Sequence, residues 1–198
     1  MKLLVFSDIH SDLKALERLL ETEADYYFAA GDLCNWGRNL DATGEVMKAR
    51  ADRVYVLPGN HESADQVSAF CARFGFHDFH GRRMEVGRYH VAGLGYSSPT
   101  PFDTPGEYTE EEIATRLNRF AGLKPLIMIC HAPPRDTTLD RVNDHVHAGS
   151  QSVHEFIVAE QPEFFFCGHI HEAAGLSEAI GGTTAINVGK KGYLLQLK

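Results

Sequence analysis

Five short apolar segments of the chain are each followed by side chains that can bind a metal ion. The segments are residues 3–6, 26–30, 54–57, 126–130 and 164–167. The side chains that follow them are Asp8, His10, Asp32, Asn60, His61, His131, His169 and His171. Oxygen and nitrogen donors without a thiolate favour Mn, Fe, Zn or Co over Ca or Mg, which prefer shells of oxygen. A pair such as His169 and His171 is weak evidence alone, so the interpretation depends on whether the five segments meet.

The elements that would carry these side chains form an alternating pattern. The five segments have the length and near-continuous apolarity of strands buried on both faces of a sheet. Between them lie helical patterns that begin at a capping residue: Ser11, Ser63, Thr109 and Ser150. The alternation predicts an α/β protein. Ligands of open α/β sheets bind beyond the carboxyl ends of the strands, so we expect the five loops to converge on one site.

The remaining segments predict a second sheet and two long loops. Residues 84–86, 90–95, 183–188 and 193–197 are short strand-like segments without helices between neighbours. They are expected to form hairpins in a second sheet packed on the first. Residues 96–108 and 132–149 show no periodicity. Long loops inside a compact domain are more often functional than idle.

The number of donor side chains is too large for a single ion. Two ions a few Å apart, bridged by one carboxylate, are the arrangement that clamps the attacking and leaving oxygens in phosphoryl chemistry. Asp8 and Asp32 would offset the charge of two dications, and Asn60 would add a neutral carbonyl oxygen. Such a site lowers the pKa of a bridging water enough to provide hydroxide near neutral pH.

Five motifs, in chain order, carry a resemblance to a known family. They are D-x-H (8–10), G-D (31–32), G-N-H-E (59–62), a strand-terminal His131 and G-H-x-H (168–171). The chain resembles the calcineurin-like metallophosphoesterase superfamily, and within it the small single-domain bacterial and archaeal predicted phosphoesterases. The resemblance implies a four-layer αββα sandwich, with two mixed β-sheets flanked by helices and a binuclear metal centre at the strand ends.

The resemblance also implies a role for each motif residue. One ion would be bound by Asp8, His10, Asp32 and His171, and the other by Asp32, Asn60, His131 and His169. His61 would protonate the leaving oxygen or donate to the phosphate. The two divalent ions would be Mn²⁺, Fe²⁺/Fe³⁺, Zn²⁺ or Co²⁺, and Mn²⁺ is favoured.

The favoured activity is hydrolysis of small phosphodiesters, including nucleotide-derived ones, by in-line attack of a metal-bridging hydroxide. A phosphomonoesterase or protein phosphatase is the first alternative. It is disfavoured because Asn35 and Trp36 replace the Asp and Arg of the G-D-x-V-D-R-G motif, and Arg38 is displaced by two positions. A non-catalytic metal-binding scaffold is the second alternative, and it is disfavoured because every ligand position is retained.

Other residues near these motifs have weaker interpretations. Trp36 and the Pro-rich loop 96–108 could form an apolar wall for a base or an aryl group. His145 and His147 are interpreted as solvated loop residues. Asn187 and Gly189 are candidates for the rim of the same site.

Composition bounds the remaining possibilities. The 198 residues, 43% of them hydrophobic, suit one domain spanning residues 1–198. A net charge of −8 without basic clusters argues against a dedicated nucleic-acid surface and against a nuclease of large DNA. Neither a signal-peptide core nor an apolar run of roughly 18 residues is present, so a cytoplasmic protein without membrane contact is expected. Four cysteines without C-x-x-C spacing predict reduced, buried thiols, and no feature predicts an oligomeric state.

Overall fold

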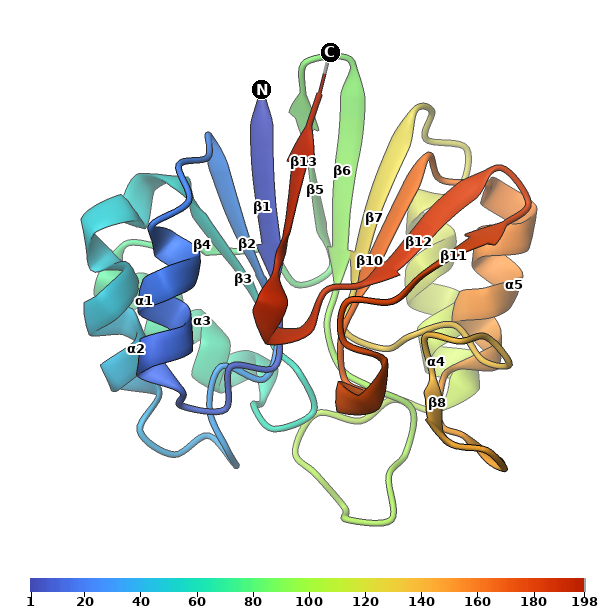
Figure 1. Cartoon of the computed structure of the whole chain (residues 1–198), viewed down its shortest axis with the longest axis horizontal. Helices are drawn as coiled ribbons and strands as arrows, with labels where there is room; N and C mark the ends of the chain where they lie inside the picture. The colour runs from blue at the N-terminus through green and yellow to red at the C-terminus, as the bar shows by residue number, and fades with distance from the viewer. Residues whose placement is uncertain (198) are drawn as a thin grey trace.

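A computed structural model describes residues 1–197 of the chain as a sandwich of four layers (Figure 1). Two β-sheets face each other in the middle, and helices cover their outer faces. The first sheet is covered by α1 (Leu13–Leu20), α2 (Leu40–Met47) and α3 (Ala64–Phe74), and the second by α4 (Glu110–Leu117) and α5 (Gln151–Glu160). The predicted αββα architecture is therefore confirmed.

The two sheets are mixed, each with a parallel centre and antiparallel strands at an edge. The first has the order β13-β1-β2-β3-β4, with β13 (Tyr193–Gln196), β1 (Lys2–Phe6), β2 (Tyr26–Ala30), β3 (Val54–Leu57) and β4 (His77–Asp78). The second has the order β11-β12-β10-β7-β6-β5, with β11 (Ser177–Ile180), β12 (Thr183–Asn187), β10 (Phe164–Cys167), β7 (Leu126–Cys130), β6 (Tyr89–Leu94) and β5 (Arg82–Val86). A separate hairpin joins β8 (Arg141–Asn143) to β9 (Val146–His147). Short 3₁₀ helices are η1 (Lys48–Arg53), η2 (Asn118–Phe120), η3 (His171–Ala173) and η4 (Gly189–Lys191).

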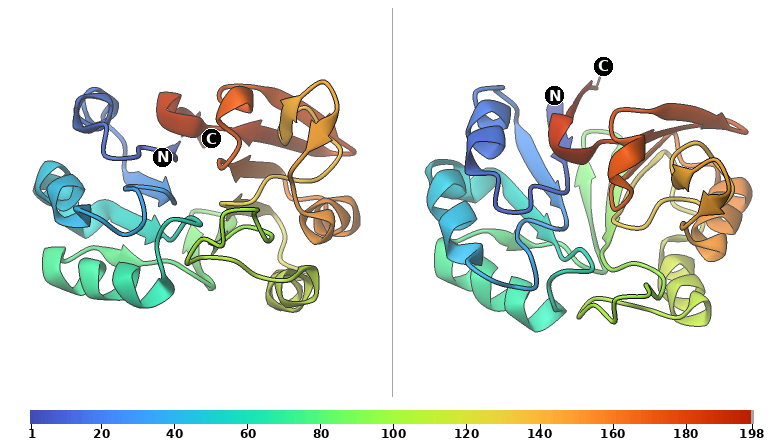
Figure 2. Two further views of the ribbon diagram at one scale, coloured as in Figure 1. Left: turned by 90° about the horizontal axis from the view of Figure 1, so that it is seen from below. Right: turned by 60° about the horizontal axis from the view of Figure 1, so that its bottom comes forward.

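All five predicted buried strands are confirmed, as β1, β2, β3, β7 and β10. Within each sheet they run parallel, so their carboxyl ends and the loops that follow lie at the lower edge in Figure 1. Seen from below, loops from the two halves of the molecule meet in the middle (Figure 2). This edge is where the metal-binding motifs were expected.

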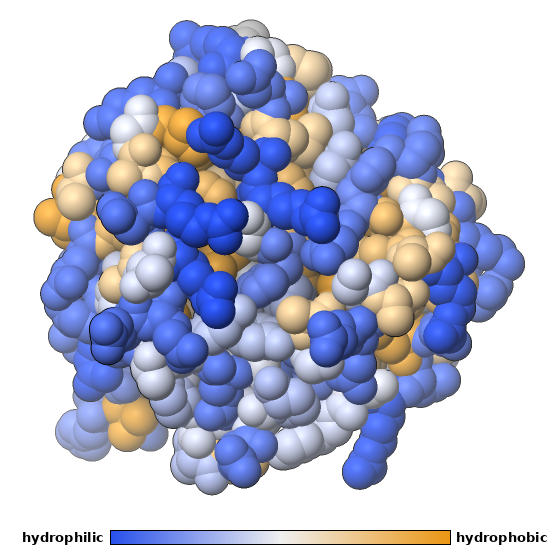
Figure 3. Space-filling model, turned by 180° about the vertical axis from the view of Figure 1, so that it is seen from behind, coloured by the Kyte–Doolittle hydropathy of each residue, from blue (hydrophilic) through white to orange (hydrophobic). Residues whose placement is uncertain are grey.

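The apolar interior is divided by the sheets into three clusters. One lies between α1–α3 and the first sheet, one between the two sheets, and one between the second sheet and α4 and α5. Phe28, Ile129 and Phe166 fill the space between the sheets and are fully buried. Each buried side chain of this size contributes about 1.5–3 kcal/mol relative to exposure. On the face seen in Figure 3, polar side chains are interspersed with apolar patches.

Three of the four predicted helix starts are confirmed. Ser63 and Thr109 form capping boxes, and Ser150 accepts a hydrogen bond from the Val153 N–H. The prediction for Ser11 was wrong. Asp12 is the N-cap and accepts from the Ala15 N–H at 3.1 Å, because Ser11 itself adopts a left-handed conformation with φ of 63°.

The strand pairing of the C-terminal segments also differs from the prediction. Residues 84–86 and 90–95 do form a hairpin, as β5 and β6. Residues 183–188 and 193–197 do not, because β12 pairs with β10 and β11 whereas β13 crosses to the other sheet and pairs with β1. The helix α2 was missed, because a Gly and a Thr inside it weaken the helical pattern.

The four cysteines, Cys34, Cys71, Cys130 and Cys167, are buried free thiols, as expected. In residues 1–197 no helix combines the length and the apolar character needed to cross a membrane.

Candidate metal centre

The loops after the five parallel strands bring all seven predicted metal ligands to one place. Asp8 and His10 follow β1, Asp32 follows β2, Asn60 follows β3, His131 follows β7, and His169 and His171 follow β10. Donor atoms of six of these residues, together with the neighbouring His61, form overlapping groups that span at most 4.8 Å: Asp8, His10 and His171; His10, Asp32 and His61; and Asp32, His131 and His169. Each group has the composition of a site for a divalent metal ion.

Asp32 lies between the two halves of this cluster. Its Oδ2 is 3.4 Å from Nε2 of His131 and 3.7 Å from Nε2 of His10. His131 comes from the second sheet and His10 from the first, so one carboxylate faces ligands from both sheets. This is the geometry expected of a carboxylate shared between two ions.

The remaining ligands flank Asp32 on its two sides. On one side, Oδ1 of Asn60 is 2.9 Å from Nδ1 of His169 and 3.1 Å from Nε2 of His131. On the other side, Nε2 of His171 is 3.6 Å from Oδ1 of Asp8. The cluster thus contains every residue of the two ligand sets that the family resemblance implied, and the division of these residues between two ions stays a prediction.

The outer ring nitrogens of two histidines are held by the protein. Nδ1 of His10 donates to Oδ1 of Asn35 at 2.8 Å, and Nδ1 of His131 donates to the Ala30 carbonyl at 2.9 Å. A neutral imidazole that donates from Nδ1 has its lone pair on Nε2. Both Nε2 atoms point into the cluster, so these rings are oriented as metal ligands usually are. Asn35, whose role the sequence did not reveal, therefore positions His10.

The charge of the centre favours cations. Asp8 and Asp32 are 2% and 1% exposed. Burial alone would lower the pKa of His131, but the adjacent Asp32 carboxylate raises it to about 9. The same pairing with His131 holds the pKa of Asp32 below its ordinary value despite burial. The carboxylates thus draw a proton to His131, and a divalent ion would supply that positive charge in its place.

The backbone is strained at the candidate ligands. Asp8, His10, Asp32 and His169 have φ angles of 58°, 48°, 54° and 69°. Such left-handed conformations are uncommon outside glycine and persist where the surrounding structure enforces them. Gly59 and Gly168 contribute by close approach, because a Cβ at either position would collide with the carboxylate of Asp32 or Asp8.

Glu62 ties the loop after β2 to the loop after β3, a role that the sequence did not reveal. Its buried carboxylate accepts hydrogen bonds from the backbone N–H groups of Asp32 at 3.1 Å, Cys34 at 2.9 Å and Gly59 at 3.0 Å. Burial and the charge of Asp32 raise the pKa of Glu62 to about 7, and the backbone donors act in the opposite direction. Glu62 therefore positions Asp32 and Asn60 relative to each other.

Asn187 performs a similar task on the other side of the centre. It is fully buried, and its amide donates to the carbonyls of Gly168 at 3.2 Å and Ile170 at 2.9 Å. These carbonyls flank His169, so Asn187 shapes the loop that presents both C-terminal histidines. It supports the site from beneath and does not line its rim.

His61 stands beside the metal ligands and faces the cleft above them. Its backbone N–H donates to Oδ1 of Asp32 at 2.9 Å, and its Nδ1 accepts from the Trp36 N–H at 3.3 Å. Because Nδ1 accepts, the neutral ring carries its proton on Nε2. The indole of Trp36 packs edge-on against this ring at 5.6 Å between centroids. Trp36 thus orients His61, and it does not line the cleft.

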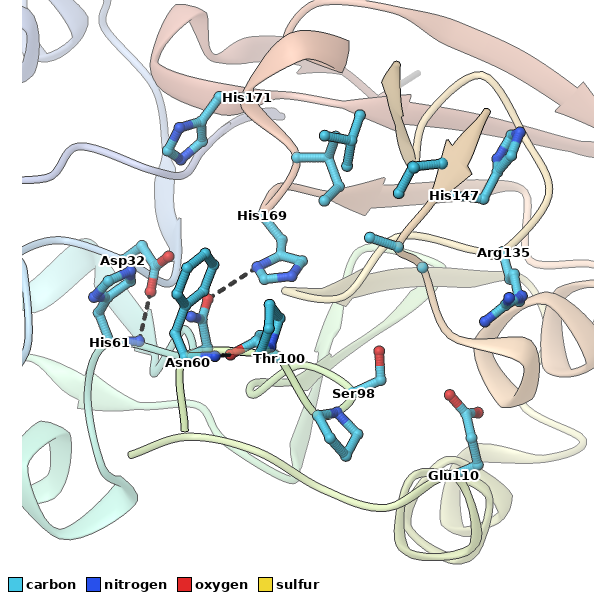
Figure 4. A pocket seen from close by; sticks show the side chains of 18 residues that line it. Asp32, Asn60, His61, Ser98, Thr100, Glu110, Arg135, His147, His169 and His171 are labelled. Carbon is cyan, nitrogen blue, oxygen red and sulfur yellow. Dashed lines mark hydrogen bonds between the residues drawn. The ribbon is translucent and has the colours of Figure 1, made fainter. Parts of the chain in front are cut away.

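A cleft of about 690 Å³ opens above the metal centre (Figure 4). Its floor includes Asp32, Asn60, His61, His169 and His171. One wall is residues 98–102 of the Pro-rich loop, and the other is the β8–β9 hairpin with Val142, Val146 and Ala148. The two long loops singled out in the sequence are therefore the two walls.

Comparison with known proteins agrees with this geometry. The family described as calcineurin-like phosphoesterase matches residues 1–173. The chain belongs to this family. It is 33% identical over 205 residues to an uncharacterized protein of Methanocaldococcus jannaschii, covering 98% of this chain and 91% of that one.

Solved structures share the fold of this chain at low sequence identity. The protein TT1561 of Thermus thermophilus has a TM-score of 0.72 at 18% identity, covering 95% of this chain and 88% of its own. The phosphopantetheinyl hydrolase of Mycobacterium tuberculosis has a TM-score of 0.67 at 16% identity, with coverages of 95% and 88%. A dimetal phosphatase of Danio rerio has a TM-score of 0.62 at 12% identity, with coverages of 94% and 86%.

Proposed function

We propose that this phosphoesterase binds two divalent metal ions, Mn²⁺ being favoured, and hydrolyses small phosphodiesters. The observation that carries the proposal is the position of Asp32 between two groups of ligands. Asp8, His10 and His171 complete one site with Asp32. Asn60, His131 and His169 complete the other. The bound ions would activate a water molecule and stabilise the charge on the phosphoryl oxygens.

The preference for a diester follows from the charges around the centre. Among the described residues that line the cleft, Arg135 is the one Lys or Arg, and it lies at the end away from Asp32 and His61 (Figure 4). Trp36 stands where protein phosphatases of the superfamily carry an arginine. A monoester dianion gains more from a guanidinium clamp than a diester monoanion does. The site therefore suits the singly charged ester better.

His61 acts in this proposal as a hydrogen-bond donor to the substrate. The Trp36 N–H already occupies the lone pair of Nδ1, so Nε2 is the nitrogen that donates. A ring protonated at both nitrogens would lose this hydrogen bond, because its Nδ1 proton would point at the Trp36 N–H. Of the two roles open from the sequence, donation to a phosphoryl or leaving oxygen thus fits better than transfer of a proton.

The first experiment compares two chromogenic esters. Metal-depleted protein is resupplied with Mn²⁺, Fe²⁺, Zn²⁺ or Co²⁺, and hydrolysis of bis-p-nitrophenyl phosphate is measured against p-nitrophenyl phosphate. We expect metal-dependent turnover with the higher kcat/KM for the diester. A higher value for the monoester would replace the diesterase with a phosphomonoesterase. Metal binding without turnover of either ester would favour a scaffold.

A further inference from the structure

The cleft extends well beyond the metal centre. Asp32 and His61 lie at one end, and Glu110, Arg135 and His147 lie at the other (Figure 4). A volume of about 690 Å³ is much larger than one phosphoryl group needs and is in the range of pockets for whole small molecules. The substrate therefore has room for an arm that reaches away from the reacting phosphorus.

Both walls of the cleft carry apolar side chains. Pro99, Pro101 and Phe102 stand on one wall, and Val142 and Val146 stand on the other. Phe102 is 71% exposed although it is large and apolar. Such surfaces favour a hydrocarbon chain or a flat ring over a polyhydroxylated arm.

The far end carries one cationic side chain, Arg135, whose guanidinium makes few contacts with the protein. The backbone of Arg135 is fixed, since its N–H donates to Ser150 and its carbonyl accepts from Nδ1 of His154. Its guanidinium has one weak ion pair, with Asp136 at 4.0 Å. The Arg135 backbone is thus fixed, and its guanidinium is free to bind a ligand.

His147 lines the same end of the cleft and is held by a buried carboxylate. Asp140 is fully buried, accepts from the N–H groups of Thr137 and Gly149, and lies 2.6 Å from Nδ1 of His147. Because Nδ1 donates to the Asp140 carboxylate, the neutral ring carries its lone pair on Nε2. His147 therefore does not behave as the solvated loop residue expected from the sequence.

Glu110 is the one acidic side chain lining this end, and it is engaged by neighbouring donors. Its Oε2 accepts from the Ser150 hydroxyl and from the Ser152 N–H, both at 2.8 Å. These contacts fasten α4 to α5 and partly satisfy the carboxylate. Glu110 keeps its negative charge but directs Oε2 to donors of α5, and Arg135 is the cationic side chain at this end.

We propose that the substrate is a phosphoester whose apolar arm ends in a second anionic group, and that Arg135 binds this distal anion. The inference rests on the proposed hydrolase function, because the metal centre would bind the reacting phosphoryl group. The apolar walls would contact the arm between the two charged ends.

Binding of alkylphosphonates to the Mn²⁺-loaded protein, measured by calorimetry, tests the proposal without turnover. Chains of increasing length carry a methyl, a carboxylate or a phosphonate at the far end. At one chain length, we expect the anion-terminated compounds to bind about tenfold more tightly than the methyl-terminated one, as charge-assisted hydrogen bonds do. The carboxylate and phosphonate arms show which anion fits better, and the gain should shrink as salt rises.

Two variants locate the effect. Arg135→Gln should abolish the tenfold gain and leave the methyl-terminated compound unchanged, whereas Arg119→Gln, an exposed arginine outside the cleft, should keep the gain. Equal affinities in the unmodified protein, or a gain that persists in Arg135→Gln, would overturn the subsite. A gain without Mn²⁺-dependent hydrolysis of either nitrophenyl ester, or of a phosphodiester that carries the preferred anion-terminated arm, would instead retain the subsite and reject the hydrolase.

Discussion

The metal centre and the walls of the cleft lie next to each other but differ in burial and in support. Asp32 and His131 are at most 1% exposed and are held by hydrogen bonds. On the walls, Phe102 and Val146 are 71% and 45% exposed. The candidate metal ligands thus lie on a buried floor shared by both sheets, whereas the walls are two exposed loops. Surface loops vary in sequence more freely than buried positions do.

The largest effect is expected from Asp32→Ala, because this carboxylate faces ligands of both ions. Both metals should be lost, and turnover should fall by about 10³-fold or more, which corresponds to about 4 kcal/mol. Metal content by atomic spectroscopy and kcat/KM are the measurements. Asp136→Ala, an exposed acidic residue outside the cluster, is the control. Normal metal content in Asp32→Ala would refute the shared carboxylate.

His61→Ala should lower the turnover rate without removing the metal ions. Loss of one donor to the transition state costs about 10²- to 10³-fold in kcat. Both ions should remain bound, since His61 is assigned no ligand role. His61→Gln keeps an N–H donor, so part of the rate should return. A variant that loses an ion would move His61 from donor to ligand.

Glu62→Gln tests whether the hydrogen bonds of Glu62 hold the loops that carry Asp32 and Asn60. The amide can satisfy only part of the three backbone N–H groups, and each buried unsatisfied donor costs about 1–3 kcal/mol. We expect a loss of that size in the free energy of unfolding and a roughly 10- to 100-fold weaker metal affinity. Glu112→Gln, an exposed capping glutamate, is the matched control and should change stability little. Equal effects of the two variants would contradict the role of Glu62.

The smallest effect on stability is expected from the wall. Phe102→Ala should leave the free energy of unfolding within about 0.5 kcal/mol, because the ring is exposed. It should raise KM for bis-p-nitrophenyl phosphate by roughly two- to fivefold, as expected for loss of part of an apolar contact. Val158→Ala, at a residue that is 55% exposed on α5, should change neither quantity. A fall in kcat with unchanged KM would place Phe102 in the chemistry and remove the distinction between floor and wall.

Much of the fold followed from local sequence. Each of the five buried strands is marked by its own apolar run, and each of the three confirmed capping residues by the residues just after it. The pairing of β13 with β1 could not be predicted from local sequence, because the two strands lie at opposite ends of the chain and no nearby residue marks the partner strand. Likewise, a Gly and a Thr inside α2 hide a helix that tertiary packing stabilises.

The candidate site divides in the same way. The sequence by itself determined the donor types and their order after the strands, since parallel strands bring such loops to one edge. Only the tertiary structure decided which residues support them, because Asn35, Glu62 and Asn187 act through backbone and ring contacts that span up to 30 residues. It also decided that Arg135 and His147 line the same cleft as the candidate metal ligands, since loops distant in sequence share a surface only when the two sheets pack.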